Sequence, residues 1–145
     1  MTESSSSKSD LSLPRSRRLC HDLEYQAVYG ARMKKQRGPI TAFVAPNGRG
    51  HWRLGLAVGK RVGNAVARNT VKRALREAFR HVQHELPLLA DGQGCDMVLS
   101  AHAHAGLGAK AYEAVVLELA GLAQREWVRR GVKQENRADG EKREA

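Results

Sequence analysis

The sequence predicts an α+β fold, a two-layer α/β sandwich in which helices cover a small sheet. Two segments, one after Asn64 and the other at 111–130, have the apolar periodicity of long amphipathic helices, and the segments 40–46 and 52–60 alternate as strands do. The segment 95–101 (CDMVLSA) is apolar without alternation, which is typical of a strand buried on both faces. With a short helix at the start, the expected order is helix, strand, strand, helix, strand, helix, with room for one more strand before the central helix.

The two alternating segments divide their side chains between the faces of the predicted sheet. The segment before them, 21–30 (HDLEYQAVYG), reads as a short helix ended by glycine, and 31–38 reads as a polar, cationic connection. The expected faces are Ile40, Ala42 and Val44 against Thr41, Phe43 and Ala45 in the first strand, and Leu54, Leu56 and Val58 against Gly55, Ala57 and Gly59 in the second. A face of Gly and Ala lets a helix or an extended ligand approach closely, and both explanations remain open.

Both ends of the chain are predicted to lie outside the folded domain, which is expected to span 15–131. Residues 1–14 are rich in serine and residues 132–145 are almost entirely polar or charged, so both are expected to be disordered tails. The two cysteines, Cys20 and Cys95, stand at unrelated positions and fit a reducing compartment. No apolar segment has the length of a signal sequence core or a membrane span, so a cytoplasmic protein with no membrane partner is expected.

Basic residues are concentrated in one part of the chain. The formal net charge is +10, yet residues 15–80 hold 16 Lys or Arg and 3 acids, a net charge of +13, while the rest of the chain carries −3. The positive charge therefore belongs to the folded region and not to a basic tail. Such a distribution favours a shaped site for a nucleic acid.

The segment 60–82 (KRVGNAVARNTVKRALREAFRHV) carries the largest share of this charge. Its one acid, Glu77, is outnumbered by seven cations: Lys60, Arg61, Arg68, Lys72, Arg73, Arg76 and Arg80. Asn64 suits the N-cap of a helix, on which the later cations form one arc and the apolar residues the opposite arc. Because acids at helical spacing are nearly missing, this arc is expected to bind a polyanion and not merely to be solvated. Glu77 stands four residues after Arg73, which predicts an ion pair between them.

The short helix at 21–30 places two tyrosines on one side. Tyr25, Val28, Tyr29 and Arg32 follow the spacing i, i+3, i+4 and i+7. Tyrosines in this pattern are either packed in the core or partly exposed as a platform on which nucleic-acid bases stack. Both interpretations remain open from the sequence.

Groups that would cut a nucleic acid are not evident. The histidine pairs 102/104 and 81/84 have no cysteine or acid at metal-ligand spacing, so no metal site is expected in this chain. Acids are sparse in the basic region, and neither a phosphate-binding Walker loop nor a nucleophile elbow is present. The sequence therefore predicts a protein that binds RNA or DNA and contributes no catalytic residue.

The segment 53–79 (RLGLAVGKRVGNAVARNTVKRALREAF) closely resembles the signature of the bacterial ribonuclease P protein subunit family. That signature runs from a strand through Lys-Lys/Arg and Val/Ile-Gly-Asn-Ala-Val to Arg-Asn-x-x-Lys-Arg-x-x-Arg-Glu. The segment 24–30 (EYQAVYG) is similar to the family's Asp-Phe-Gln-x-Val-Phe. The order of elements fits from residue 15 to about 130, so the resemblance covers most of the chain.

The resemblance implies a subunit of the ribonucleoprotein that removes the 5′ leader of precursor tRNA. In that family the RNA subunit performs the Mg²⁺-assisted hydrolysis, so this chain is expected to hold no cofactor of its own. Its expected partners are ribonuclease P RNA and the precursor tRNA 5′ leader, with no protein partner evident. The implied fold is that of the ribosomal protein S5 domain 2-like proteins, whose crossover between parallel strands is left-handed, against the usual rule.

The resemblance also implies which residues bind each partner. The residues expected to contact the catalytic RNA are Lys60, Arg61, Asn64, Arg68, Asn69, Lys72, Arg73 and Arg76. The residues expected to hold the leader are Tyr25, Tyr29 and Phe43. Thr70 stands where the family commonly has arginine, so one phosphate contact is lost or passed to a neighbour. The alternatives are a structural RNA-binding protein of ribosomal type and, less favoured, a stand-alone nuclease.

Overall fold

The computed structural model describes residues 13–104 and 106–144, with side chains described as far as residue 131. A single turn, η1 (Arg15–Arg17), leads into α2 (Asp22–Gly30), which is followed by three strands: β1 (Lys34–Arg37), β2 (Ile40–Pro46) and β3 (Arg53–Leu56). The central helix α3 (Ala65–Val82) and a turn, η2 (Gln83–Glu85), then lead to β4 (Cys95–Ala101) and the long helix α4 (Ala109–Glu144).

The four strands form one mixed sheet in the order β1-β2-β4-β3. β2 pairs antiparallel with both β1 and β4, whereas β3 and β4 are parallel, with Leu54 opposite Met97. A parallel pair needs a long connection, and α3 supplies it. The segment before α2 adds one further contact at the outer side of β3, where the Leu19 N–H donates to the carbonyl of Leu54 at 2.8 Å.

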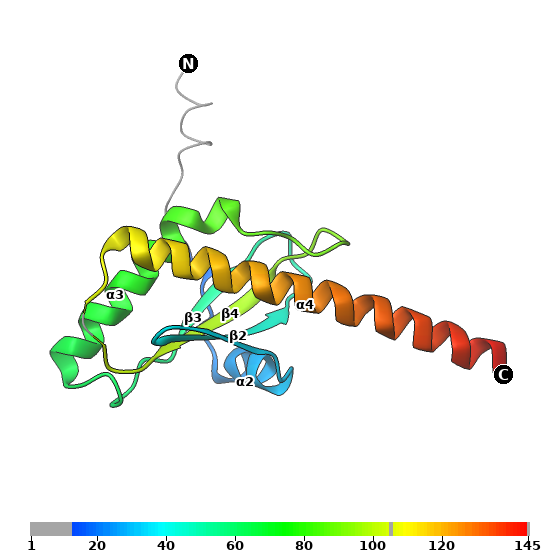
Figure 1. The fold of residues 1–145 in the computed structure, drawn as a ribbon, viewed down its shortest axis with the longest axis horizontal. Coiled ribbons are helices and arrows are strands. Elements are labelled where there is room, and N and C mark those ends of the chain that lie inside the picture. Colours follow the sequence, from blue (N-terminus) through cyan, green and yellow to red (C-terminus); the bar gives the residue numbers. More distant parts are fainter. Residues whose placement is uncertain (1–12, 105, 145) are drawn as a thin grey trace, which may run out of the picture.

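Helices pack on both faces of this sheet (Figure 1). α3 and α4 share the main core with one face of the sheet, and its fully buried side chains include Ile40, Val44, Trp52, Leu75, Phe79, Leu99, Val116 and Leu119. α2 lies against the other face, where Val28 packs with Ala45 and Val98 in a smaller cluster. Because α2 is short, it covers only part of that face.

The α+β fold class is confirmed, and strands form in the three segments predicted for them, although β3 covers only Arg53–Leu56 of the expected 52–60. Ile40, Ala42 and Val44 contribute to the main core, and Phe43 and Ala45 contribute to the cluster under α2, as the alternation predicted. All residues of β4 except Ser100 are buried. One expectation was wrong: residues 34–37 are an edge strand and not a connection. Gly38, with φ of 58°, makes the tight turn that lets this cationic segment pair with β2.

The last helix is longer than the sequence suggested. α4 continues to Glu144 and so runs through most of the segment 132–145, for which a disordered tail was predicted. No proline follows Pro87, so nothing in the covalent backbone stops the helix there. Most of the predicted N-terminal tail, residues 1–12, lies outside the described residues. Of the helices that the structure describes, none is both long and apolar enough to cross a bilayer.

Candidate nucleic-acid interface

The central helix α3 begins as its sequence predicts. The Ala67 N–H donates to Oδ1 of Asn64 at 2.9 Å, which makes Asn64 the N-cap. The preceding Gly63 has φ of 143°, a conformation that side-chain-bearing residues rarely adopt. This turn directs the chain from β3 into α3 and places Lys60 and Arg61 at the helix entrance. Its side-chain oxygen accepts this one capping bond, so the amide N–H groups of Asn64 and the second lone pair of that oxygen are left for a ligand.

The seven cations of the segment 60–82 are almost free of acidic partners. Six of them form no ion pair and no side-chain hydrogen bond with any described residue. These six are Lys60, Arg61, Arg68, Lys72, Arg73 and Arg76. The Nε atom of Arg68 is buried within the structure without a described hydrogen-bond partner. Like charges at helical spacing repel one another, so this surface gains stability when an anion approaches.

The predicted ion pair between Glu77 and Arg73 was wrong. Glu77 instead binds Arg80, three residues later, through two hydrogen bonds of 3.0 and 2.9 Å. These bonds to the Arg80 guanidinium hold the pKa of Glu77 below its usual range. Arg73 lies on the other side of Glu77 and keeps its charge available for a ligand.

The cations face three different hollows on the surface. Lys72 and Arg76 line a cavity of about 250 Å³ together with Arg18 from the segment before α2. Lys60 and Arg61 line a cleft of about 480 Å³ over the sheet. Arg73 lines a groove of about 580 Å³ between α3 and α4. The sequence predicted one cationic face, whereas the folded chain distributes it among sites with different neighbours.

The cleft over the sheet lies on the face that α2 only partly covers. Its floor crosses every strand or its extension: Lys34 and Gln36 from β1, Thr41 and Phe43 from β2, Ser100 from β4, and Ala57 and Gly59 after β3. Ala57 and Gly59 project little or no side chain into the cleft, so a ligand can approach the backbone there, as the face of Gly and Ala predicted. The lining contains three cations and no acid. An extended polyanion can therefore lie across the sheet here with its phosphates near Lys34, Lys60 and Arg61.

The structure separates the two tyrosines of α2. Tyr29 reaches the cleft, is 40% exposed, and makes an edge-to-face contact with Phe43 at 4.9 Å between ring centroids. Tyr25 does not line this cleft. Its hydroxyl accepts a hydrogen bond of 3.2 Å from the Leu56 N–H, and its ring lies over Gly55. Tyr29 and Phe43 thus form an aromatic platform, whereas Tyr25 packs α2 onto β3 and lines the cavity that holds Lys72 and Arg76.

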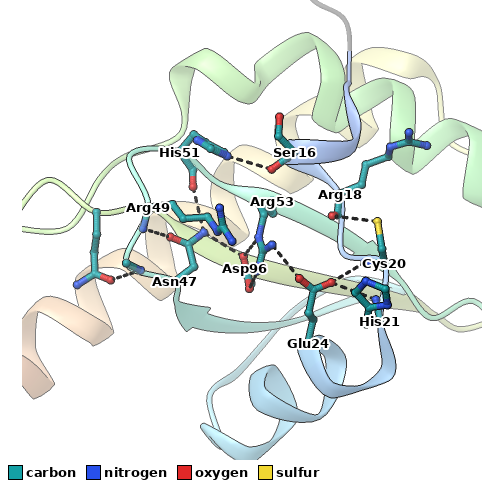
Figure 2. A network of polar contacts seen from close by, with 12 residues as sticks. Ser16, Arg18, Cys20, His21, Glu24, Asn47, Arg49, His51, Arg53 and Asp96 are labelled. Atoms are coloured by element: carbon teal, nitrogen blue, oxygen red, sulfur yellow. Dashed lines mark hydrogen bonds and ion pairs between the residues drawn. The ribbon is translucent and has the colours of Figure 1, made fainter.

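A buried polar network anchors the start of α2 to the sheet (Figure 2). Arg53 of β3 is only 9% exposed and binds Asp96 of β4 in a bidentate pair, with bonds of 2.8 and 2.7 Å. Its Nη1 donates to Oε2 of Glu24 at 2.9 Å, while Oε1 of Glu24 accepts from the N–H groups of Cys20 and His21. These backbone bonds and, next, the Arg53 charge lower the pKa of Glu24 to about 2.

The network has a direct consequence for the cleft. Glu24 lies in the first turn of α2 and Tyr29 in the last turn, so fixing one end of this short helix sets where the aromatic platform sits. The sequence did not identify this network, because its three charges come from three separate elements. The available signals were an arginine at the start of one apolar strand and an aspartate, Asp96, within another, since a charged side chain in such a strand needs a buried partner.

The histidines have structural partners. His81 binds Glu113 through Nδ1 at 3.0 Å, and His104 binds the hydroxyl of Tyr112 at 2.7 Å. In the part of the chain that the structure describes, no three His, Cys, Asp or Glu side chains form a group that could hold a metal.

Comparison with known proteins identifies the family. The family model described as Ribonuclease P matches residues 13–126, most of the chain. The chain belongs to the family of ribonuclease P protein components. It is 38% identical over 115 residues to the ribonuclease P protein component of Desulfovibrio desulfuricans, covering 78% of this chain and 85% of that protein. The role of ribonuclease P protein subunit, expected from the sequence, is thereby confirmed, and with it an association with ribonuclease P RNA.

Solved structures of ribonuclease P proteins share the fold. The protein from Staphylococcus aureus is 26% identical, with a TM-score of 0.59 over 74% of this chain and 95% of that one. The protein from Thermotoga maritima is 23% identical, with a TM-score of 0.60 over 74% of this chain and 96% of that one. Because the Thermotoga maritima protein is less similar in sequence, its similarity to this chain shows a shared fold and nothing more. Together they show that the mixed sheet and its helices are the architecture of ribonuclease P proteins.

Proposed function

We propose that this ribonuclease P subunit holds the single-stranded 5′ leader of precursor tRNA in the cleft over the sheet. The observation that carries the proposal is the lining of that cleft, where the Tyr29–Phe43 pair stands among Lys34, Lys60 and Arg61 without any acid. Single-stranded RNA binds to such surfaces by stacking bases on aromatic rings while cations track the phosphates. The hydroxyl groups of Thr41 and Ser100 lie on the same floor and suit contacts to ribose or phosphate.

The cations of α3 are proposed to bind ribonuclease P RNA. Arg68, Lys72, Arg73 and Arg76 come from one helix, and none of them forms an ion pair with a described acid, although the charge of Arg76 acts on the neighbouring Glu77. A helix anchored by five buried side chains presents charges at fixed spacing, which suits a folded RNA better than a flexible chain. In this arrangement α3 fixes the protein on the RNA, and the cleft guides the leader.

The chemistry is assigned to the RNA subunit with its Mg²⁺ ions. The acids of the described interface are already engaged, Glu77 with Arg80 and Glu24 with Arg53. The carboxylate cluster that Mg²⁺ catalysis by the protein would need is therefore not available at the cleft. The protein's contribution is to position the substrate in a particle that we expect in the cytoplasm.

Leader binding is tested by comparing precursor and mature tRNA in the reconstituted particle. Tyr29→Ala should weaken precursor affinity by about 1–3 kcal/mol, the usual contribution of one stacked base, and leave mature tRNA binding nearly unchanged. Tyr25→Phe is the matched control, because it removes only the hydroxyl bonded to Leu56. Equal losses for both RNAs in Tyr29→Ala would argue against a leader site.

A second assay separates the classes of function. Cleavage of precursor tRNA should require ribonuclease P RNA and be stimulated by this protein. Cleavage without that RNA would indicate a nuclease in the protein itself, and no stimulation would indicate a structural RNA-binding protein. For α3, Arg68→Ala should weaken RNA binding and lower the slope of log affinity against log salt by about one, because one phosphate contact is lost.

A further inference from the structure

The groove between α3 and α4 takes no part in the proposed leader binding, yet it is the largest of the three hollows that the cations face. Its volume is about 580 Å³, within the range of small-molecule pockets. The walls are apolar: Ala74 and Ala78 from α3 face Tyr112 of α4 and Leu107 from the loop before it. Figure 1 shows the two helices crossing at the end of the domain where this loop runs.

Two apolar side chains that line this groove are exposed to solvent and are not covered by any described part of the chain. Val66 is 74% exposed and Leu107 is 37% exposed, although both belong to a chain with a well-filled core. Exposed apolar surface gathered in a hollow marks a site where a ligand is buried. The groove wall itself is firm, since Ala78 and Tyr112 are almost completely buried and the Tyr112 hydroxyl is fixed by His104.

The polar groups of the groove are divided between its two ends. At the far end, Glu113 is bound to His81, and Glu77 is bound to Arg80. The hydroxyl of Thr70 donates to the carbonyl of Val66. Asn69 and Arg73 lie nearest to the cationic side of α3, and neither side chain has a hydrogen bond within the described residues. A ligand entering here thus meets an uncommitted amide, an uncommitted guanidinium and apolar walls.

We infer that this groove receives one unstacked nucleobase of ribonuclease P RNA. The inference rests on the proposed function, in which α3 lies on that RNA. Arg73 binds a phosphate of the flipped nucleotide, the Asn69 amide offers a donor and an acceptor to the edge of the base, and the apolar walls cover its faces. RNA is commonly recognised in this way, through unpaired bases taken out of the stack.

The charge of the groove favours RNA over other occupants. Two acids line it, but Glu77 is bound to Arg80 and Glu113 to His81, so Arg73 is the charged side chain of the lining that has no ion pair among the described residues. An apolar helix of another protein would fill the walls but would cover the exposed Arg73 without bringing a negative charge to it, which is costly. A nucleotide brings the apolar ring and the negative charge together in one unit.

The test uses a variant that fills the groove. Thr70 is exposed and lines the groove, so Thr70→Phe places a ring where the base would lie. Affinity for ribonuclease P RNA should fall about 5- to 150-fold, the value of one stacked base, and the salt slope should fall by about one, because the phosphate bound by Arg73 leaves the groove with its base. The control is Ala114→Phe, the same addition at an exposed position of α4 that lines none of the three hollows; it should bind RNA as the unmodified protein does.

Chemical probing of the RNA bases identifies the occupant. A base held in the groove should be protected in the complex with the unmodified protein and become reactive in the complex with Thr70→Phe. Leu107→Ala, which removes one exposed wall without touching the helices, should expose the same base and weaken binding several-fold. This second variant keeps the test decisive if Thr70→Phe unfolds, which its melting temperature will show.

The outcomes separate the inference from the proposed function. If Arg68→Ala weakens RNA binding but both groove variants leave affinity and base protection unchanged, the groove holds no base and the inference is overturned. If Thr70→Phe lowers affinity and the salt slope but no base of the RNA becomes reactive, the groove lies on a phosphate path and the base assignment is again wrong. If Arg68→Ala has no effect either, the proposed placement of α3 on the RNA fails.

Discussion

The buried network around Arg53 predicts a specific dependence of stability on pH, and Glu24→Gln tests it. The glutamine keeps an oxygen that accepts from the N–H groups of Cys20 and His21, but its other terminal atom is an amide that cannot accept from Arg53. The substitution therefore removes the charge while it preserves the shape and the helix cap.

The size of the effect follows from the pKa of Glu24. A fall from the ordinary value near 4.5 to about 2 corresponds to about 3 kcal/mol of unfolding free energy at neutral pH. This figure is an upper limit, because a quarter of the Glu24 side chain is exposed to solvent. The folded-state pKa is lowered, so the contribution is complete above pH 4.5 and is lost as the pH falls towards 2. At pH 3 about 1.4 kcal/mol of it should remain.

The measurement is urea unfolding of the unmodified protein and Glu24→Gln at several pH values from 7 to 3. The stability difference should be greatest at neutral pH and shrink below pH 4.5. Glu85→Gln serves as the control, since that carboxylate is exposed and lies outside the network. A difference that stays constant over this range would refute the reasoning, because the loss would then come from packing and not from the charge. Precursor tRNA affinity should fall with stability, since α2 carries Tyr29.

Three further predictions concern single residues. Glu77→Gln should lower the single-turnover cleavage rate of the particle less than tenfold, about 1.4 kcal/mol, since it breaks a surface ion pair; a loss of about 10²-fold with RNA binding intact would give it a part in catalysis. Gly55→Ala should destabilise the fold by about 1–3 kcal/mol in urea titrations, because its Cβ would lie 2.9 Å from the Tyr25 ring; unchanged stability would mean that the ring moves aside freely. The Cys95 thiol, with its pKa raised to about 12 by burial, should resist alkylation in the native protein while the exposed Cys20 reacts; equal rates would show that β4 opens readily.

Much of the fold was predictable because its elements are locally encoded. The alternation in 40–46 and the cap and amphipathic pattern of 64–82 each contain their own signal, and the structure follows both. β1 was not recognised, since Lys-Lys-Gln-Arg has no apolar alternation and becomes a strand only by pairing with β2. An edge strand of this kind depends on its neighbour, which single-sequence patterns do not show.

The candidate site was predictable in composition but not in arrangement. The list of cations in the segment 60–82 came directly from the sequence, yet their distribution among three hollows depends on what α2, α4 and the sheet place opposite them. Likewise, helical spacing put Tyr25 and Tyr29 on one side of α2. In the structure, the Tyr25 ring packs over Gly55, whereas the Tyr29 ring contacts Phe43 and lines the cleft. The positions of Gly55 and Phe43 in the sheet decide this difference.

The hydrogen bond between Leu19 and Leu54 affects how this protein behaves at high concentration. β3 ends the sheet on one side, and an uncovered strand edge is a template on which another chain can pair and aggregate. Residues 18 and 19 occupy that edge, while the opposite edge is protected by the charges of Lys34, Lys35 and Arg37 on β1. A shortened chain lacking residues 13–19 would lose Leu19 from the cluster under α2 and Leu13 from the rim of the main core, and it would also present β3 to its neighbours. Residues 18 and 19 thus protect the edge of β3 from pairing with another copy of the chain. A tag or a truncation should therefore leave these residues in place.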